Sequence, residues 1–348
     1  MTVRLVLTPL ATAPIMNLVY FGSGAFGLPT LQRLAAHHAV RAVVTQPDRP
    51  AGRGGKLTPT PIAQWCHDHA PQLTLIKPEK VNDPAVIDQV RSLHADAWVV
   101  IAFGQKLSRK LLDGVFAINL HASLLPRWRG AAPINAAMLA GDSLTGNSVI
   151  TLADRMDAGL VLGQTTRSLT DDLTAGELHD LLASDGPDLV EEVLRRHQTG
   201  TLSAMHQDES MVTQAAKLSR ADSWVDFHRP ARECLRRIHG LTPWPGIGVV
   251  CSSSSDRLPM AEFKVLRVEP AGAPPEQPRV SCGQLLTAPD QGLIACGGDT
   301  WLRVVELQSP GKRPMTWEQF ARGHRLTPIL DIRSSVAPPG EPTGGRSC

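Results

Sequence analysis

Three polar residues could together transfer a proton and stabilise a developing charge: Asn119, His121 and Asp157. Asn119 and His121 end the strand-like run 116–121, and residues two apart on a strand face the same side. Asp157 follows another strand-like run, 148–154, in a turn-forming sequence. An amide, an imidazole and a carboxylate can stabilise an oxyanion and move a proton near neutral pH. No motif places a nucleophilic Ser or Cys beside them, which favours direct attack by a substrate nucleophile.

Each of these residues also has an ordinary structural interpretation. An Asn at a strand end commonly caps a turn, a His in an apolar strand commonly packs in the core, and an Asp before Ala-Gly commonly forms a turn. Their expected position favours chemistry, because open α/β sheets bind ligands at the carboxyl ends of their strands.

The N-terminal half alternates strand-like and helix-like segments, the pattern of an α/β fold with a doubly wound, mostly parallel sheet. Strands are expected at 17–21, 40–46, 73–77, 97–103, 116–121, 148–154 and 162–169, the last two as antiparallel additions at an edge. Helices are expected after the glycine-rich turn 22–27 and near 59–70, 83–94 and 105–113, then from the capping box at 174–177, with a separate helix over 186–198.

After about residue 205 the sequence changes to short strand-like runs separated by Gly, Pro and Ser, which predicts a small OB-like β-barrel. The runs are 224–227, 247–252, 262–269, 283–288, 292–297 and 301–307, with helices at 231–241 and 316–324. The expected organisation is an extension at 1–16 that the natural protein need not contain, a catalytic domain at 17–205, a linker at 206–220, a barrel domain at 221–333 and a disordered tail at 334–348.

Composition excludes several classes of protein. The 348 residues carry a net charge of only +2, so nucleic-acid binding would have to depend on local charge. Six cysteines without CxxC spacing indicate neither a zinc ribbon nor a redox pair, and they fit a reducing cytoplasm. No apolar run is long enough to span a bilayer, so no membrane association is expected. No residue pattern predicts a bound metal.

The sequence GSGAFG at 22–27 matches the dinucleotide-binding fingerprint between a strand and a helix. An NAD-dependent oxidoreductase is therefore one alternative. Against it, the expected acidic residue, Asp48, comes only after a proline that has already led the chain into a loop. The glycines also suit any tight connection from a strand to a helix.

Three segments in order, QPDRPAGRGGKLTPTPI (46–62), INLHASLLPRWRGAAPIN (118–135) and RMDAG (155–159), resemble motifs of the methionyl-tRNA formyltransferases. The resemblance extends from about residue 17 to about residue 332 and includes TQAAKLSRADSWVDF and LTPWPG in the C-terminal part. Two departures are Ala122, where some members have Gly, and DAGLVLGQ, which lacks the second acidic residue of the common DTGD.

The resemblance implies transfer of the formyl group of 10-formyltetrahydrofolate to the α-amino group of the initiator methionyl-tRNA, without a metal. In the matching motifs, Asn119, His121 and Asp157 correspond to the catalytic residues. The folate site would be formed by Ser123, Leu124, Leu125, Pro126, Phe103 and Gly104. Asn119 and His121 would face the oxyanion, while Asp157 would orient His121.

The resemblance also implies contacts with tRNA. Arg49, Arg53 and Lys56 lie on a glycine-rich loop, and Arg232 and Arg236 lie on the expected helix 231–241. Such cations bind phosphates independently of sequence, although they could equally form a solvated surface. The protein is expected to act as a cytoplasmic monomer.

Other activities remain open from the residues alone. A glycinamide ribonucleotide transformylase or a sugar-amine formyltransferase would share the Asn, His and Asp, whereas the barrel and the AGRGGK loop favour tRNA. A tRNA-binding protein without catalytic activity is a further alternative, and it predicts RNA binding that does not depend on folate.

Overall fold

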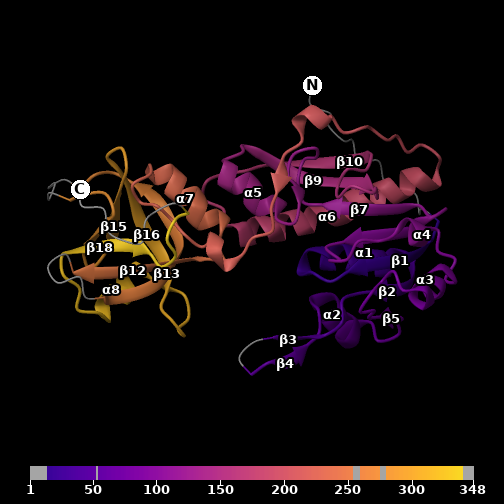
Figure 1. Ribbon diagram of the computed structural model, residues 1–348, viewed down its shortest axis with the longest axis horizontal. Coiled ribbons are helices and arrows are strands. Elements are labelled where there is room, and N and C mark those ends of the chain that lie inside the picture. Colours follow the sequence, from indigo (N-terminus) through magenta and orange to yellow (C-terminus); the bar gives the residue numbers. More distant parts are fainter. Residues whose placement is uncertain (1–13, 52–53, 254–258, 275–279, 340–348) are drawn as a thin grey trace. The chain divides into compact units, whose positions relative to one another are not determined.

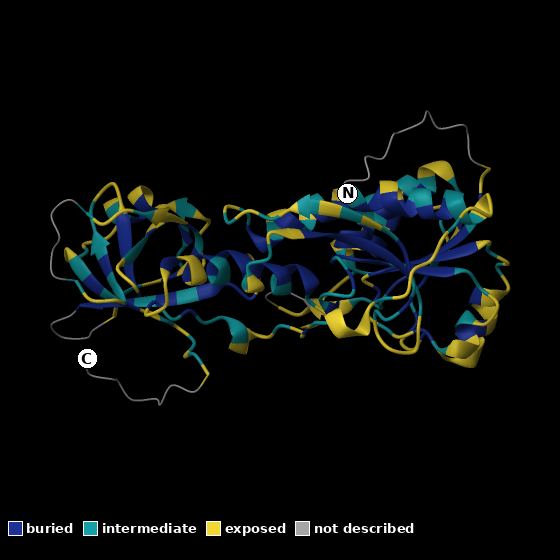
Figure 2. Ribbon diagram, turned by 90° about the horizontal axis from the view of Figure 1, so that it is seen from above, coloured by how far each residue is buried: buried dark blue, intermediate teal, exposed yellow. Residues whose placement is uncertain are grey.

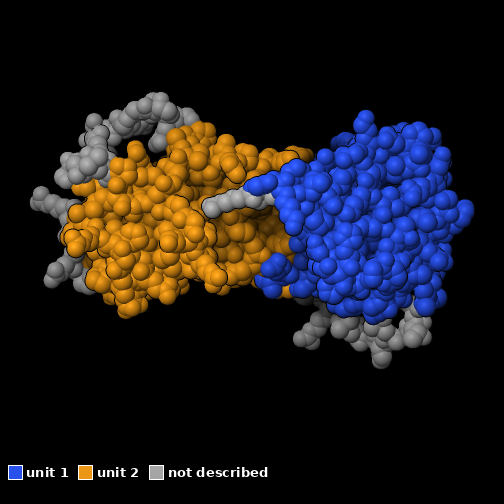
Figure 3. Space-filling model, turned by 90° about the horizontal axis from the view of Figure 1, so that it is seen from below, with its two compact units in different colours: residues 1–126, 146–165, 180–211 blue, residues 127–145, 166–179, 212–348 orange. Residues whose placement is uncertain are grey.

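The computed structural model of the chain describes residues 14–51, 54–253, 259–274 and 280–339. These residues form two compact units, which Figure 3 colours separately. Unit 1 contains the described residues up to 126 with 146–165 and 180–211; unit 2 contains 127–145, 166–179 and the described residues from 212 onward. Most of the expected extension and most of the expected tail lie outside the described residues.

A seven-stranded sheet in the order β10-β9-β7-β6-β1-β2-β5 forms the centre of unit 1 (Figure 1). Its strands are β1 (Asn17–Gly22), β2 (Ala39–Val44), β5 (Leu75–Ile76), β6 (Ala97–Ile101), β7 (Ala117–His121), β9 (Leu144–Thr151) and β10 (Val161–Ser168). The pairs β1–β2, β1–β6, β2–β5 and β6–β7 are parallel, and β7–β9 is antiparallel. The predicted mostly parallel α/β sheet is confirmed.

Helices cover both faces of this sheet. On one face, α1 (Leu28–His37) and α6 (Ala175–Gln198) are joined by an ion pair between Arg33 and Asp188, 3.1 Å apart. On the other, α3 (Pro84–Arg91) and α4 (Arg109–Leu112) contribute to a core with Phe21 and Trp98. The remaining short elements are η1 (Ala25–Gly27), β3 (Arg49–Ala51), β4 (Lys56–Thr58), α2 (Pro61–His69) and η2 (Glu209–Met211). The strands of the sheet are the buried layer in Figure 2.

The prediction of a separate helix over 186–198 is wrong, because α6 runs without interruption through Pro187. The Gly-Pro pair resembles a helix boundary, since proline lacks the N–H of an interior turn. The helix packs closely on the sheet next to this proline: a Cβ at Gly186 would come within 2.7 Å of Leu120 Cδ2 on β7. A residue without a side chain suits this position.

The glycine-rich turn after β1 accommodates a buried tyrosine. The hydroxyl of Tyr20 donates a hydrogen bond to Gly27 O at 2.9 Å, and a Cβ at Gly27 would overlap that hydroxyl. Burial raises the pKa of Tyr20 strongly. The packing of Tyr20 therefore accounts for Gly27 without a bound dinucleotide.

Unit 2 contains a closed β-barrel. Its strands pair in the order β13-β12-β18-β14-β15-β16, β13 also pairs with β16, and β17 extends the sheet beyond β16. The bounds are β12 (Ile247–Ser253), β13 (Pro259–Ala271), β14 (Gln284–Thr287), β15 (Gly292–Cys296), β16 (Thr300–Gln308), β17 (Met315–Thr316) and β18 (Ile329–Ser334). Other elements of the unit are β8 (Arg129–Gly130), α5 (Pro133–Ala140), β11 (Gln214–Ala215), η3 (Arg220–Asp222), α7 (Ala231–Gly240) and α8 (Trp317–Arg322). The predicted barrel is confirmed.

One predicted barrel strand, 224–227, is wrong. Val225 and Phe227 are buried and alternate with less buried neighbours, which imitates a strand pattern. However, the main chain of the segment 224–227 forms hydrogen bonds with side chains of other segments. Trp224 O accepts from Arg237 Nε, and Val225 N donates to Ser334 Oγ at 3.2 Å.

Candidate active site

Asn119 and His121 lie at the carboxyl end of β7, in the interior of the sheet. Asn119 is opposite Val100 of β6 and Ile150 of β9, and His121 is opposite Ser148 of β9. The His121 side chain is only 7% exposed. The alternation of the strand therefore directs both polar side chains to one face, at the edge where α/β sheets bind ligands.

Asp157 lies in the connection between β9 and β10, close to His121. Its Oδ2 is 3.7 Å from His121 Nδ1, and the Asp157 side chain is 13% exposed. This distance exceeds that of a good hydrogen bond, but it places the carboxylate and the imidazole next to each other in a site shielded from water. The Asp157 backbone is left-handed, with φ of 54°. Two of the three predicted catalytic groups are thus brought together, although they are 36 residues apart in the chain.

The 123–126 segment forms a turn directly after β7, with a cis peptide bond between Leu125 and Pro126. A hydroxyl of β9 holds its main chain: Ser148 Oγ donates to Ser123 O at 2.6 Å and accepts from Leu125 N at 3.1 Å. Gln164 Nε2, on β10, donates to Ser148 Oγ at 2.8 Å and to Leu125 O at 3.0 Å. Ser148 thus uses its one donor and two acceptor positions.

Phe103 and Gly104 follow β6 at the same edge of the sheet. The Phe103 ring packs edge-on against Phe21 at 5.5 Å and belongs to the core. Its carbonyl accepts hydrogen bonds from Ser23 Oγ at 3.1 Å and from Gln46 Nε2 at 3.2 Å. Gly104 is exposed, with φ of 87°. A ligand at this edge would therefore meet the Gly104 main chain and not the Phe103 ring.

Two of the cations predicted to contact tRNA near the AGRGGK loop, Arg49 and Lys56, lie on a short hairpin. β3 and β4 pair antiparallel, with Arg49 opposite Thr58. Arg49 is 63% exposed and forms an ion pair with Glu79 at 2.8 Å, and Lys56 is exposed. Arg53 lies outside the described residues.

The two arginines predicted on α7 share one carboxylate. Arg232 Nε is 2.9 Å from Asp171 Oδ2, and Arg236 Nε is 3.5 Å from Asp171 Oδ1. Arg236 is also largely buried, with 24% of its side chain exposed. This pairing lowers the positive potential that either arginine offers to a phosphate.

Three residues that hold the site were not found from the sequence: Ser148, Gln164 and Gln207. Gln207 Nε2 donates to the carbonyls of Asp157 and Gly159 at 2.7 and 2.8 Å. All three side chains bond to main-chain atoms of segments distant in sequence. Such contacts have no residue-type signature, although a polar residue in the apolar strand run 148–154 was a signal that could have drawn attention to Ser148.

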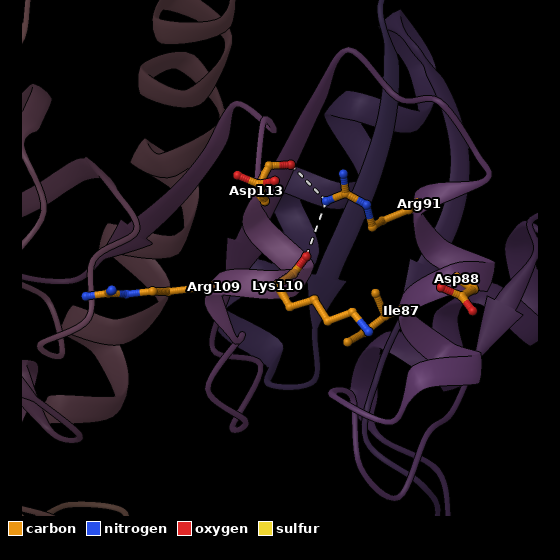
Figure 4. Close-up of a pocket in the computed structure, with 6 residues that line it drawn as sticks. All are labelled: Ile87, Asp88, Arg91, Arg109, Lys110 and Asp113. Carbon is orange, nitrogen blue, oxygen red and sulfur yellow. Dashed lines mark hydrogen bonds between the residues drawn. The ribbon is translucent and has the colours of Figure 1, made fainter.

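A cavity of about 430 Å³ between α3 and α4 contains none of the predicted site residues (Figure 4). Its lining consists of Ile87, Asp88, Arg91, Arg109, Lys110 and Asp113. Arg91 points to the end of α4, where it donates to the carbonyls of Leu111 and Asp113 at 3.1 and 2.8 Å. These contacts satisfy the last carbonyls of a helix, so they give the arginine a structural role.

Within the described part of the chain, no group of three or more His, Cys, Asp or Glu side chains could hold a metal ion. Among the helices of those residues, none is both long and apolar enough to cross a membrane.

Comparison with known proteins identifies both halves of the chain. A formyl transferase family model matches residues 16–194, and a formyl transferase C-terminal domain model matches residues 217–325. The N-formyltransferase from Helicobacter canadensis, solved with folinic acid and dTDP-3-aminofucose, is similar in fold at 12% identity. Its TM-score is 0.58, and the match covers 85% of this chain and 100% of that one. The fold and both family models define the chain as a formyl transferase.

Two relatives show which kind of formyl transferase this chain is similar to. A methionyl-tRNA formyltransferase of Nitrobacter hamburgensis is 41% identical over 322 residues, covering 90% of this chain and 98% of that protein. One of Rhodopseudomonas palustris (strain TIE-1) is 42% identical over 322 residues, covering 90% and 97%. The chain belongs to the methionyl-tRNA formyltransferase family.

Proposed function

We propose that the protein transfers the formyl group of 10-formyltetrahydrofolate to the α-amino group of initiator methionyl-tRNA. The observation that carries this proposal is the buried His121–Asp157 pair beside the 123–126 turn, in a chain of this family. The same groups could act on another amine, so the identity of the acceptor depends on the family and on the basic hairpin.

In the proposed reaction, the unprotonated amine attacks the formyl carbon and forms a C–N bond, while the carbonyl oxygen becomes an oxyanion. Asn119 would donate a hydrogen bond to that oxygen, and His121 would do so once it has taken the amine proton; losing one such donor usually costs about 10²–10³ in rate. The amine proton passes through His121, oriented by Asp157, to the folate nitrogen as its bond to the formyl carbon breaks. One N-formyl bond replaces another, so the transfer requires neither an oxidant nor a nucleotide.

The folate would bind along the main chain of the 123–126 turn and beside Gly104. The bonds from Ser148 and Gln164 support this assignment, because they fix the turn on the rigid strands β9 and β10. A preformed turn reduces the conformational entropy that a ligand must remove on binding.

The tRNA would contact Arg49 and Lys56 on the hairpin, Arg53 and, more weakly, Arg232 and Arg236. The exposure of Lys56 supports the contact at the hairpin. The arginines of α7 are paired with Asp171, so they should contribute less to tRNA binding. We further propose that the segment 17–205 carries the chemistry, that 221–333 serves mainly for tRNA contact, and that the protein acts as a cytoplasmic monomer.

The direct test mixes the purified protein with 10-formyltetrahydrofolate and methionyl-tRNA and measures formyl-methionyl-tRNA. We expect Asn119→Ala, His121→Ala and Asp157→Ala each to lower kcat by about 10²-fold or more, with unchanged thermal unfolding. The control is Asn82→Ala, which removes an exposed amide that donates to Lys106 O. Product formation that is near wild type in all three variants, or absent in the wild type, would refute the proposal.

A further inference from the structure

We propose that Gln207 is a positioning residue that fixes Asp157 for catalysis, an inference that rests on the proposed function. Gln207 lies between the segments that the two family models match, 16–194 and 217–325. The sequence predicts a linker there. The structure instead places it against the turn that presents Asp157.

The segment from Met205 to Glu209 runs antiparallel to the Asp157 turn and contacts it at every second residue. Met205 exchanges two main-chain hydrogen bonds with Val161, at 2.8 and 2.9 Å. Further along, Glu209 Oε1 is 2.9 Å from Arg155 Nη2. Gln207 lies between these two contacts, so its side chain is held at the centre of the turn from both ends.

The side-chain amide of Gln207 has two N–H groups, and the Asp157 turn offers two carbonyl oxygens that accept them. The amide nitrogen donates to Asp157 O at 2.7 Å and to Gly159 O at 2.8 Å. These two carbonyls belong to the 157–158 and 159–160 peptides, so a single side chain holds two of the three peptide planes between Asp157 and Leu160. A glutamate of the same shape would have no hydrogen to donate.

Asp157 needs such support because of its backbone. It adopts φ of 54°, a left-handed conformation that costs an L-residue about 1–2 kcal/mol. Residues keep such a conformation only where the surroundings impose it. If the Asp157 backbone left this conformation, its side chain would turn away from His121 Nδ1, now 3.7 Å from its carboxylate.

The turn has little alternative freedom at its other end. A Cβ at Gly159 would overlap the Thr151 carbonyl, and Leu160 N donates to Thr151 Oγ1 at 2.9 Å. The end after Asp157 is therefore anchored on β9, while Gln207 supplies the hydrogen bond to Asp157 itself. Movement of a catalytic group by about 1 Å can cost about 10²-fold in rate.

The test compares Gln207→Ala and the isosteric Gln207→Glu with Gln198→Ala, a control whose amide also donates to a main-chain carbonyl, that of Pro14 at 3.2 Å. We expect kcat for formyl transfer to fall by about 10- to 100-fold in both Gln207 variants, with KM for folate and for methionyl-tRNA within about twofold of wild type. The control should behave as wild type.

A double-mutant cycle separates positioning from general damage. In an Asp157→Ala background, Gln207→Ala should lower the residual rate no further, because the group that it orients is already gone. An equal fall in both backgrounds would overturn the proposal. So would kcat within twofold of wild type, or loss of folding in both Gln207 variants, since the role would then be structural.

Hydrogen exchange of the segment 155–161 gives a readout that does not depend on activity. We expect faster deuterium uptake there in Gln207→Ala than in Gln198→Ala, and unchanged uptake would refute the role of Gln207 even if no transfer were detected. A wild-type protein that fails to formylate methionyl-tRNA would instead refute the proposed function.

Discussion

Replacing Ser148 by Ala removes three hydrogen bonds at once, two of them to the turn that follows β7. The side chain is fully buried, and its hydroxyl joins Ser123 O, Leu125 N and Gln164 Nε2. Alanine fits the same space, so the loss is almost purely of hydrogen bonding. Gln164 would keep its second bond, to Leu125 O at 3.0 Å.

The expected magnitude follows from the groups left behind. A buried main-chain donor or acceptor without a partner costs about 1–3 kcal/mol. Ser148→Ala removes the acceptor of Leu125 N, so the free energy of unfolding of this unit should fall by about 1–3 kcal/mol. For a unit of this size, the unfolding temperature should fall by roughly 2–12 °C.

Ser148→Ala should raise KM for 10-formyltetrahydrofolate more than KM for methionyl-tRNA. A turn that is no longer held must be ordered by the ligand, and about 1.4 kcal/mol of such ordering raises KM for 10-formyltetrahydrofolate tenfold. Steady-state kinetics with each substrate varied in turn, together with thermal unfolding, measure both effects. The control is Ser168→Ala, at an exposed position of β10.

Two results would contradict this reasoning. Ser148→Ala with wild-type stability and wild-type folate KM would mean that the hydroxyl does not hold the turn. Ser148→Ala and Gln164→Ala with strictly additive effects would mean that the two side chains do not act as one network, since neighbours that share a partner should be coupled.

Three further predictions concern other parts of the molecule. Burial lowers the pKa of His239 below the ordinary 6.5, and its Nε2 accepts a bond from Val268 N at 3.1 Å. Its contribution to stability is therefore full above about pH 6.5 and is lost as pH falls, so His239→Gln should flatten urea-unfolding stability between about pH 7.5 and 5.5. Gly27→Ala should destabilise the protein by about 1–3 kcal/mol through overlap with the Tyr20 hydroxyl, and Tyr20→Phe should recover part of the loss in thermal unfolding. Lys56→Glu should weaken tRNA binding and reduce its salt dependence by about one to two ions without changing folate KM; equal effects on both ligands would contradict a phosphate contact.

Much of the fold follows from local patterns. The alternation of strand-like and helix-like runs predicts the α/β sheet, and regular short runs after residue 205 predict the barrel. The errors arise where packing overrides a local signal. Pro187 suggests a helix boundary, yet α6 continues through it, where the neighbouring Gly186 packs close to Leu120. The run 224–227 alternates like a strand, yet its main chain bonds to the side chains of Arg237 and Ser334 and to main-chain atoms of Asp222 and Gly297.

The barrel also closes through a strand that the sequence does not reveal. β18 pairs with both β12 and β14, and its segment was not predicted as a strand. The segment is short and mixes buried Leu330 and Ile332 with charged residues. Pairing with two neighbouring strands stabilises it, and that contribution depends on segments far away in the chain.

The residues of the site also fall into a group that the sequence reveals and a group that it does not. Asn119, His121 and Asp157 are detectable because their chemical types and their places at strand ends indicate catalysis. Ser148, Gln164 and Gln207 escape detection, because their amide and hydroxyl groups do not suggest a reaction and they act on main-chain atoms.

These two groups should also respond differently to substitution. A reacting group loses its function with any change of chemical type, whereas a group that holds a main chain needs only its donors and its reach. Ser148→Thr keeps the hydroxyl on a strand that favours β-branched residues, so it should preserve far more activity than Ser148→Ala. Gln207→Glu keeps the shape and removes the donors, so it should be no better than Gln207→Ala. The opposite order at either position would show that volume, and not hydrogen bonding to the backbone, holds the catalytic turn.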